Sequence, residues 1–225
     1  MLSARLIKDA NADIVALQEV YDRFALDAFH DQALLPAGVA PYPHRVLFDG
    51  NDGRGFDVAL LSRLPILAAH SHAQASFAEL DVAVPDLSWD PNERIFRRDC
   101  LEADIAVGAE TLTLFVCHFK AMGRVRAETR DVRLAEASAV RRLIERRFED
   151  PSEALWMILG DLNDHVERDG VAEPEHALRP LFKDGFAVDL MTRIPDPRER
   201  WTYHYAPLDI YARPDHLLVS PALAA

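Results

Sequence analysis

Two polar side chains, Asp161 and Asn163, directly follow the apolar run at residues 154–159. A short apolar run that ends at a glycine predicts a buried strand leading into a loop. Alternate residues at a strand end lie on one side of it, and open α/β sheets present their working residues at the carboxyl ends of strands. Asp161 and Asn163 can therefore face one reacting group. The alternative is an ordinary turn, because Asp and Asn favour local hydrogen bonds there.

Three further polar residues stand at predicted strand ends. Glu19 follows the apolar residues 14–17, where an acid is either a surface charge or a placed functional carboxylate. His118 follows the alternating residues 111–116, and Asp99 lies near the start of the strand expected to pair with them. A lone histidine is usually surface or core filler. A contact with Asp99 would instead fix the imidazole tautomer and favour its protonated form.

Helical and strand periodicities alternate along the chain. Residues 41–55 predict a short strand among turns. Residues 70–92 predict an irregular segment with one strand near its middle. Residues 182–190 predict a loop or short helix that ends at Asp189. Strands that alternate with helices and then form hairpins predict an α/β fold with mixed sheets covered by helices, in one domain. We expect helices at 2–11, 21–35 and 125–148, a hairpin of strands 97–105 and 111–116 around Gly108, and further strands at 14–17, 58–62, 154–159, 201–205 and 213–220.

The composition limits the function classes. The chain has 225 residues, 49% of them hydrophobic, which suits one domain with a substantial core. Its net charge is −12, whereas a protein that holds long nucleic acid usually carries a basic surface. Residues 120–150 contain nine Lys or Arg against six Asp or Glu, which we interpret as a solvated helix face. The alternating aromatics at 201–205 are interpreted as core or sheet-face residues rather than a base-stacking platform.

The cysteines and apolar runs bear on the compartment. Cys100 and Cys117 are too few for a disulfide framework and lack metal-binding spacing, so we expect two buried thiols rather than a bridge. No apolar run is long enough to cross a bilayer, and the first residues have no signal-peptide core. The compartment stays open, with the cytoplasm as the default, and we expect a monomer.

Five stretches, in the same order along the chain, resemble the endonuclease/exonuclease/phosphatase superfamily. This is the fold of deoxyribonuclease I, apurinic endonucleases, neutral sphingomyelinases and inositol-polyphosphate 5-phosphatases. The resemblance covers nearly the whole chain and implies an α/β four-layer sandwich, in which two mixed β-sheets pack face to face and are flanked by helices. The matching stretches lie at residues 12–20, 54–63, 116–120, 159–164 and 215–220.

The resemblance also implies roles for the residues singled out above. Glu19 resembles a metal-binding glutamate, and Asp161 and Asn163 resemble a D-x-N pair that places the attacking water and binds the phosphate. His118 resembles a strand-end histidine that touches a phosphate oxygen, and Asp99 an acid paired with it. The implied cofactor is Mg²⁺, with Mn²⁺ as the alternative, held by Glu19 and Asp161. Carboxylate oxygens are ligands that Mg²⁺ prefers.

Two departures from the family pattern concern the ends of the chain. The family opens with a strand that ends in Asn, whereas this sequence opens at a predicted helix. The family closes with a Ser-Asp-His segment, but Asp215 and His216 precede Leu-Leu-Val-Ser and so match the preceding strand. We therefore interpret Asp215 as the residue that orients the closing histidine and His216 as filling an aromatic position. We expect the single domain at residues 1–225 to lack the first strand and the final Ser-Asp-His strand.

These residues predict a Mg²⁺-dependent phosphoester hydrolase of the phosphodiesterase or endonuclease type, in which water attacks phosphorus in line with the leaving oxygen. One alternative is a member that is non-catalytic, or inactive through truncation, and acts as a binding domain. Another is a hydrolase of lipid or inositol phosphates. The substrate stays open among DNA, RNA, a phospholipid head group and an inositol phosphate.

Overall fold

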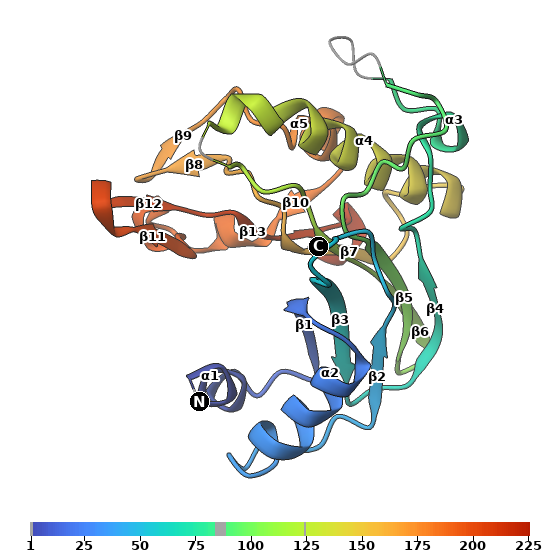
Figure 1. Cartoon of the computed structure of the whole chain (residues 1–225), viewed down its shortest axis with the longest axis vertical. Coiled ribbons are helices and arrows are strands. Elements are labelled where there is room, and N and C mark those ends of the chain that lie inside the picture. The colour runs from blue at the N-terminus through green and yellow to red at the C-terminus, as the bar shows by residue number, and fades with distance from the viewer. Residues whose placement is uncertain (1, 84–88, 124) are drawn as a thin grey trace.

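A computed structural model describes residues 2–83, 89–123 and 125–225 (Figure 1). The N-terminal part contains α1 (Leu2–Ala10), β1 (Ile14–Val20), α2 (Arg23–Phe29), the π-helix η1 (His30–Leu34), β2 (His44–Leu47), β3 (Asp57–Ser62) and β4 (Ile66–Ser71). The middle contains α3 (Phe77–Leu80), β5 (Cys100–Val107), β6 (Glu110–His118), the 3-10 helix η2 (Arg126–Thr129), α4 (Arg130–Arg147) and β7 (Trp156–Asp161).

The last part of the chain consists of short elements. They are β8 (Glu167–Arg168), β9 (Val171–Ala172), α5 (Arg179–Phe182), β10 (Val188–Asp189), β11 (Tyr203–Tyr205), β12 (Ile210–Ala212), β13 (Asp215–Val219) and α6 (Pro221–Ala224). Four 3-10 helices lie among them: η3 (Lys183–Gly185), η4 (Leu190–Arg193), η5 (Pro197–Glu199) and η6 (Ala206–Leu208).

The strands form three sheets within the described residues. Their orders are β1-β3-β2, β10-β13-β7-β6-β5-β4 and β11-β12-β8-β9. The six-stranded sheet is mixed, because β6 and β7 run parallel while the other pairs are antiparallel. The three-stranded sheet is antiparallel throughout, so the prediction of two mixed sheets was wrong for it. Of the third sheet only the strand at 201–205 was predicted; β8 and β9 have two residues each, which is too short to show a period of two. The α/β class is confirmed.

Hydrophobic side chains gather in three buried clusters. Strand β3 contributes to two of them, since neighbouring residues on a strand point to opposite faces. Ala59 and Leu61 pack with Ala4 and Leu26, beneath α1 and α2. A third cluster joins β6 and β7 to α4. The cluster shared by β3 and the six-stranded sheet contains Val58, Leu60, Leu101, Ala103, Ile105, Leu114 and Val116.

Helix α4 covers one face of the six-stranded sheet (Figure 1) and is the longest helix among the described residues. No helix in that part of the chain is long and apolar enough to cross a membrane. The interpretation of its arginines as a solvated face was wrong for Arg133, which is fully buried. The Arg133 guanidinium donates to Thr129 Oγ1 at 2.6 Å and contacts Asp164 Oδ2 at 3.3 Å. A buried charge is stable only with such partners.

Glu136 of α4 is also fully buried and joins two chain segments next to the sheet. Its Oε1 accepts a hydrogen bond from the Arg97 N–H at 3.0 Å, and its Oε2 accepts one from the Lys120 N–H at 2.7 Å. Arg97 precedes β5 and Lys120 follows β6. One carboxylate therefore holds the chain at the beginning of β5 and at the end of β6.

The hairpin predicted around Gly108 is confirmed. Strands β5 and β6 pair from Cys100 opposite Cys117 to Val107 opposite Glu110. The two cysteines are buried free thiols with their Sγ atoms 3.5 Å apart, which confirms the expected state.

The segment at residues 70–92 differs from its prediction. The preceding strand, β4, was not predicted; it pairs with β5. Near the middle of the segment the described residues hold the helical turn α3 instead of a strand, and 84–88 lie outside the described residues. Ser76 caps α3 by accepting a hydrogen bond from the Glu79 N–H at 3.2 Å. The sequence Ser-x-x-Glu is a signal for a helix N-terminus and could have identified this turn.

Strand β11 confirms the strand predicted at 201–205, but its aromatic side chains do not enter the core. Trp201, Tyr203 and Tyr205 are 47%, 48% and 42% exposed, and none belongs to the three buried clusters. Of the two alternatives, the interpretation as core residues was wrong, whereas Tyr203 and Tyr205 do lie on a sheet face. β11 is an edge strand of the small four-stranded sheet, so little of the chain covers it.

Gly160 allows the close approach of β7 to β6. Its φ is +133°, and a Cβ atom added there would overlap the carbonyl oxygen of Cys117. Only glycine fits both the backbone conformation and the space.

Replacing Gly160 with Ala is expected to lower the free energy of unfolding by about 3 kcal/mol, because the new methyl group meets the backbone of the paired strand. Urea unfolding measures this change. The control is Gly53→Ala, where an added Cβ meets nothing within 4 Å. Equal effects of the two substitutions would contradict the proposed constraint.

Replacing Glu136 with Ala is expected to lower the free energy of unfolding by about 3 kcal/mol, because two buried backbone N–H groups lose their acceptor. The exposed Glu149, which follows α4, provides the control: Glu149→Ala should change stability by less than about 0.5 kcal/mol. A loss for Glu136→Ala as small as that of the control would show that the two N–H groups find other partners.

Stability should also depend on pH through Glu136. Burial raises the pKa of this carboxyl from 4.5 to about 7. Between those values the folded chain binds a proton that the unfolded chain does not, so this stabilising contribution is full below pH 4.5 and is lost as the pH rises through 7. The stability advantage of the wild type over Glu136→Gln should therefore shrink between pH 4.5 and 7. An advantage that grows with pH would contradict the raised pKa.

Candidate active site

Asp161 ends β7 and lies in the middle of a row of polar residues. In the register of the six-stranded sheet it is opposite His118 of β6 on one side and Asp215 of β13 on the other. Asp99 extends the row on the far side of His118. Cys100 pairs with Cys117 in the antiparallel strands β5 and β6, so the preceding Asp99 lies opposite the following His118. Residues opposite each other in a sheet lie on the same face. Four predicted site residues from widely separated parts of the sequence therefore lie side by side.

Asn163 is joined to Asp161 by a local turn. Its N–H donates to Asp161 Oδ1 at 2.9 Å, and its φ of +50° is in the left-handed region that Asn tolerates. Its Nδ2 donates to the carbonyl oxygen of Phe119 at 3.0 Å. The turn is confirmed, and it is compatible with the predicted functional role of Asp161, because it occupies only one carboxylate oxygen. Asp161 Oδ2 is not used by the turn and lies 3.8 Å from His118 Nε2.

Neighbouring charges and burial shift the pKa values in the row. Burial raises the pKa of Asp161 to about 6, and the Asp215 and Glu19 carboxylates act in the same direction. Burial lowers the pKa of His118 to about 4, assisted by the Arg98 guanidinium. His118 is therefore neutral near pH 7, in contrast to the protonated form expected from a contact with an acid.

Asp99 and His118 do not form the expected contact: no hydrogen bond or ion pair joins them within the described residues. Asp99 is buried, its Oδ1 accepts a hydrogen bond from the His72 N–H at 2.9 Å, and burial raises its pKa to about 6. Its Oδ2 and His118 Nδ1 are both buried without a partner in that part of the chain. The direct contact is thus not formed in the structure, whereas a functional role of Asp99 stays a prediction.

Glu19 reaches this region from the three-stranded sheet. It is exposed, its φ is +58°, and the pairing of β1 with β3 shifts register between Leu17 and Val20. Such a bulge redirects a side chain. The side chain of the preceding residue, Gln18, approaches Gly160 of β7, which places this end of β1 beside the end of β7.

The residues present fit a divalent cation by the chemistry of their oxygen atoms. Glu19 and Asp215 both raise the pKa of Asp161, and a cation among these carboxylates would relieve their repulsion. Within the described residues, no three His, Cys, Asp or Glu side chains converge as a complete protein cage. Mg²⁺ does not need one, because it is commonly held by one or two carboxylates and keeps several waters.

Asp215 and His216 have separate tasks at the beginning of β13. Asp215 Oδ2 accepts a hydrogen bond from Thr202 Oγ1 at 2.5 Å. His216 is buried, and burial lowers its pKa to about 4. Its Nε2 lies 2.8 Å from the carbonyl oxygen of Asp164. The His216 side chain thus contacts the loop after β7 and is not one of the side chains of the row.

Arg98 belongs to the site but was not singled out in the sequence. This buried guanidinium donates through Nη1 to the carbonyl oxygen of Phe119 at 2.7 Å and through Nε to Asp52 Oδ2 at 2.9 Å. The same carbonyl accepts the Asn163 amide. Arg98 and Asn163 are therefore positioned through a shared backbone acceptor, which residue types alone do not reveal.

Asp164 anchors the loop that carries Asn163. It is fully buried and accepts hydrogen bonds from the Ala177 N–H at 2.9 Å and from Arg126 Nε at 2.6 Å. Burial acts to raise the pKa of Asp164, but the Ala177 N–H, Arg133 and Arg126 together lower it. This carboxylate therefore has a structural role: it fixes the loop after β7 that carries Asn163.

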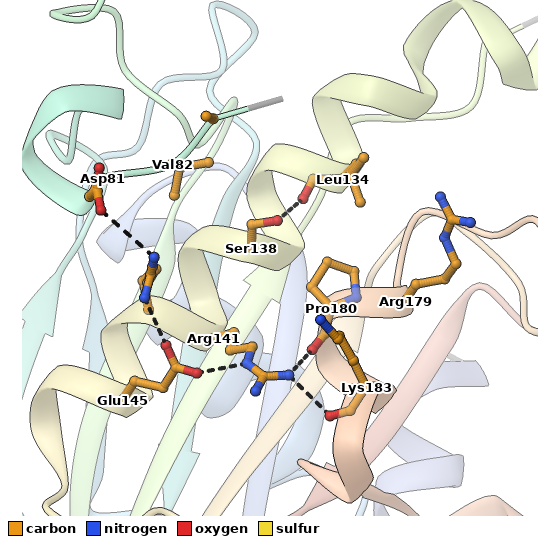
Figure 2. Close-up of a pocket in the computed structure, with 11 residues that line it drawn as sticks. Asp81, Val82, Leu134, Ser138, Arg141, Glu145, Arg179, Pro180 and Lys183 are labelled. Carbon is orange, nitrogen blue, oxygen red and sulfur yellow. Dashed lines mark hydrogen bonds and ion pairs between the residues drawn. The ribbon is translucent and has the colours of Figure 1, made fainter. Parts of the chain in front are cut away.

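A cavity of about 830 Å³ lies elsewhere, between α4, α5 and the residues after α3 (Figure 2). Figure 2 shows Arg141 between Glu145 and the carbonyl oxygens of Pro180 and Lys183. None of the residues in the row lines this cavity. This cavity is therefore separate from the candidate site at the strand ends.

Three solved structures have the same fold. They are truncated Caenorhabditis elegans TDP2 (19% identity, TM-score 0.61, covering 97% of this chain and 75% of that one), sphingomyelinase C from Streptomyces griseocarneus (18%, 0.61, 99% and 77%) and the human Nocturnin catalytic domain with bound sulfate (13%, 0.62, 97% and 73%). At these identities the likeness shows the fold alone. A search of the curated proteins gave no match.

The sequence itself establishes the family. The Endonuclease/Exonuclease/phosphatase family matches residues 4–225, which include all five stretches identified from the sequence. The predicted resemblance is confirmed. The chain belongs to the endonuclease/exonuclease/phosphatase family, a family of metal-dependent phosphoester hydrolases.

Proposed function

We propose that the chain is a Mg²⁺-dependent phosphodiesterase of the endonuclease type. The observation that carries this proposal is the row at the strand ends, in which Asp161 lies between His118 and Asp215. Asn163 adjoins the row through the turn at Asp161. A carboxylate, a neutral imidazole and an amide at one sheet edge supply a proton acceptor and hydrogen-bond donors for hydrolysis of a phosphoester.

Glu19 and Asp161 would hold the Mg²⁺ ion, with Asp215 nearby to increase the negative potential. When bound, the ion polarises a phosphoryl oxygen and neutralises charge that develops on it. The oxygen chemistry and the charge of these side chains support this assignment.

Each protein group has a task in the attack of water on phosphorus. Asp161 Oδ2, which the turn leaves free, orients the water and accepts its proton. The neutral His118 ring donates to a phosphoryl oxygen, and Asn163 donates its second amide hydrogen, since the first is bound to Phe119. Loss of one placed donor of this kind raises the barrier by about 3 kcal/mol. Asp99 and Asp215 act as positioning residues at the two ends of the row.

We further propose that the sheets and helices form a four-layer sandwich. The buried cluster shared by β3, β5 and β6 supports packing of the three-stranded sheet on the six-stranded sheet. The clusters beneath α1 and α2 and beneath α4 support helical layers on the two outer faces. In this arrangement Glu19 and Asp161 belong to opposite sheets and meet at one edge of the sandwich.

Hydrolysis of bis(p-nitrophenyl) phosphate and nicking of plasmid DNA test the proposal. We expect activity with Mg²⁺, loss of activity with EDTA and recovery when Mg²⁺ is added in excess. Asp161→Asn should lower the rate at least about 100-fold, because it removes the proton acceptor and a metal ligand.

Asp9→Asn serves as the control, since Asp9 is an exposed acid on α1. It should retain the wild-type rate. Equal rates for Asp161→Asn and the wild type would contradict the role of Asp161. Absence of metal-dependent turnover in the wild type, on both substrates, would favour a non-catalytic binding domain.

A further inference from the structure

The cavity between α4 and α5, here called the α4 groove, has no task in the proposed chemistry. Its volume of about 830 Å³ is that of a ligand site. Figure 2 shows α4 between two walls, with Asp81 and Val82 on one side and Pro180 and Lys183 on the other. None of the residues in the row lines the groove, so its role is separate from the attack on phosphorus.

The groove is elongated, because it follows α4. Its lining residues on this helix run from Leu134 to Glu145, which is about three turns. At about 1.5 Å per residue this distance is about 16 Å, the length of about five residues of extended chain. A compact anion would fill only a part of such a groove.

Cations outnumber acids among the residues that line the groove. Its charged side chains are four cations and two acids: Arg141, Arg142, Arg179, Lys183, Asp81 and Glu145. The local net charge is therefore +2, on a chain whose net charge is −12. This reversal of sign makes the groove complementary to an acidic partner.

Arg141 is a fixed cation in the groove. Its Nε donates to Glu145 Oε1 at 2.7 Å, and its Nη1 donates to the carbonyl oxygens of Pro180 and Lys183 at 2.9 and 3.1 Å. The guanidinium also lies over the Phe186 ring, 4.5 Å from its centroid. Its Nη2 makes no hydrogen bond within the described residues. A carboxylate can therefore bind Nη2 without breaking any of these contacts.

Arg142 is a cation whose present partners are easily exchanged. Its side chain is 48% exposed and lies 3.3 Å from Glu145 Oε2 and 3.7 Å from Asp81 Oδ2, and the Asp81 side chain is 88% exposed. Exposed ion pairs of this kind contribute little to stability. A carboxylate from a partner can therefore replace Asp81 at little cost.

The opposite wall of the groove supplies two further cations. Arg179 contacts Glu175 at 3.3 Å, and both side chains are largely exposed. Lys183 is exposed, and its ammonium group has no ion-pair partner in the described part of the chain. These two cations flank Pro180, so acidic groups can bind on either side of an apolar contact.

Apolar side chains lie between the charges. Leu134, Val82 and Pro180 line the groove. Val82 belongs to the buried cluster beneath α4, and the partly buried Leu134 packs against the same cluster. The groove thus offers an apolar surface to an occupant that carries an apolar side chain among its acids.

We propose that the α4 groove binds an acidic peptide segment of a partner protein. Carboxylates of the segment pair with Arg141, Arg142 and Lys183, and an apolar side chain packs on Leu134. A nucleic acid is disfavoured, because Asp81 and an acid on α4 interrupt the cations that would follow its phosphates. The proposal does not depend on the proposed hydrolysis.

Fluorescence anisotropy with the whole chain tests the proposal. The probe is a fluorescein-labelled peptide of about ten residues, in which Glu residues surround one central Leu. The wild type should bind it saturably. A peptide with Gln in place of every Glu should bind at least about tenfold more weakly. A peptide with Ser in place of the Leu should bind about threefold more weakly.

A variant that carries Arg142→Glu and Lys183→Glu reverses two cations of the groove. It should bind the acidic probe at least about tenfold more weakly than the wild type, and it should bind a peptide with Lys in place of Glu more tightly than the wild type does. The control carries Arg5→Glu and Lys8→Glu, which make the same change of net charge at exposed positions of α1. It should bind the acidic probe as the wild type does.

Two further variants separate charge, fold and catalysis. Arg142→Lys combined with Lys183→Arg keeps both charges and should keep binding. Asp161→Asn should bind as the wild type does, so a failure of the proposed catalysis is recognised separately. Equal circular dichroism of the charge-reversed variant and the wild type shows that the fold is kept.

Several outcomes would overturn the peptide groove. They are failure of the wild type to bind the acidic probe, equal binding of the Gln peptide, and equal binding by the charge-reversed variant. Displacement of the probe by inorganic phosphate at the same concentration would assign the groove to a small anion. Binding of single-stranded DNA that the charge reversal abolishes, without binding of the acidic probe, would assign it to nucleic acid.

Discussion

The parallel pairing of β6 with β7 is the constraint on which the site depends. It sets His118 beside Asp161 at the end of two strands, and the antiparallel pairing with β13 adds Asp215 on the other side. The pairing requires glycine at position 160, where the backbone of β7 meets the Cys117 carbonyl. Because side-chain positions in a sheet repeat every two residues, a shift by one residue would turn the whole row to the opposite face.

Buried charges hold the loops that complete this row. Glu136 joins the segments before β5 and after β6, Arg98 holds the Phe119 carbonyl, and Asp164 anchors the loop after β7. Each is surrounded by donors or acceptors from the backbone, so removal of one partner leaves another polar group buried and unpaired. Buried polar contacts therefore fix the positions of the loops around the site, and apolar packing fixes the sheet that carries the row.

Much of this arrangement could be predicted from local patterns. Apolar runs that stop at polar residues predicted that strands end near Glu19, His118 and Asp161. Alternation of apolar and polar residues predicted the hairpin around Gly108. Arg98 was missed because its partners are a backbone carbonyl group and an acid 46 positions away, which no local motif records. The buried Arg133 was misinterpreted for a related reason, since its acid partner is 31 positions away in the sequence.

The aromatic strand at 201–205 shows a different limit of periodicity. Alternation identified the strand, but it does not distinguish a face that packs on a core from one that no other layer covers. The aromatic side chains are exposed because β11 lies at the edge of a small sheet. Their exposure therefore follows from the three-dimensional arrangement and not from the sequence pattern.

The cysteine pair across β5 and β6 has a consequence for the dynamics of the sheet. Both thiols are fully buried, each is next in sequence to a residue of the row, and burial raises the pKa of Cys100 well above its ordinary value. Thiol reagents attack the thiolate, so alkylation requires a local opening that admits solvent to the face of the sheet that α4 covers. The alkylation rate thus measures the free energy of this local opening. The protein contains its own probe of how often the core between α4 and the sheet is uncovered.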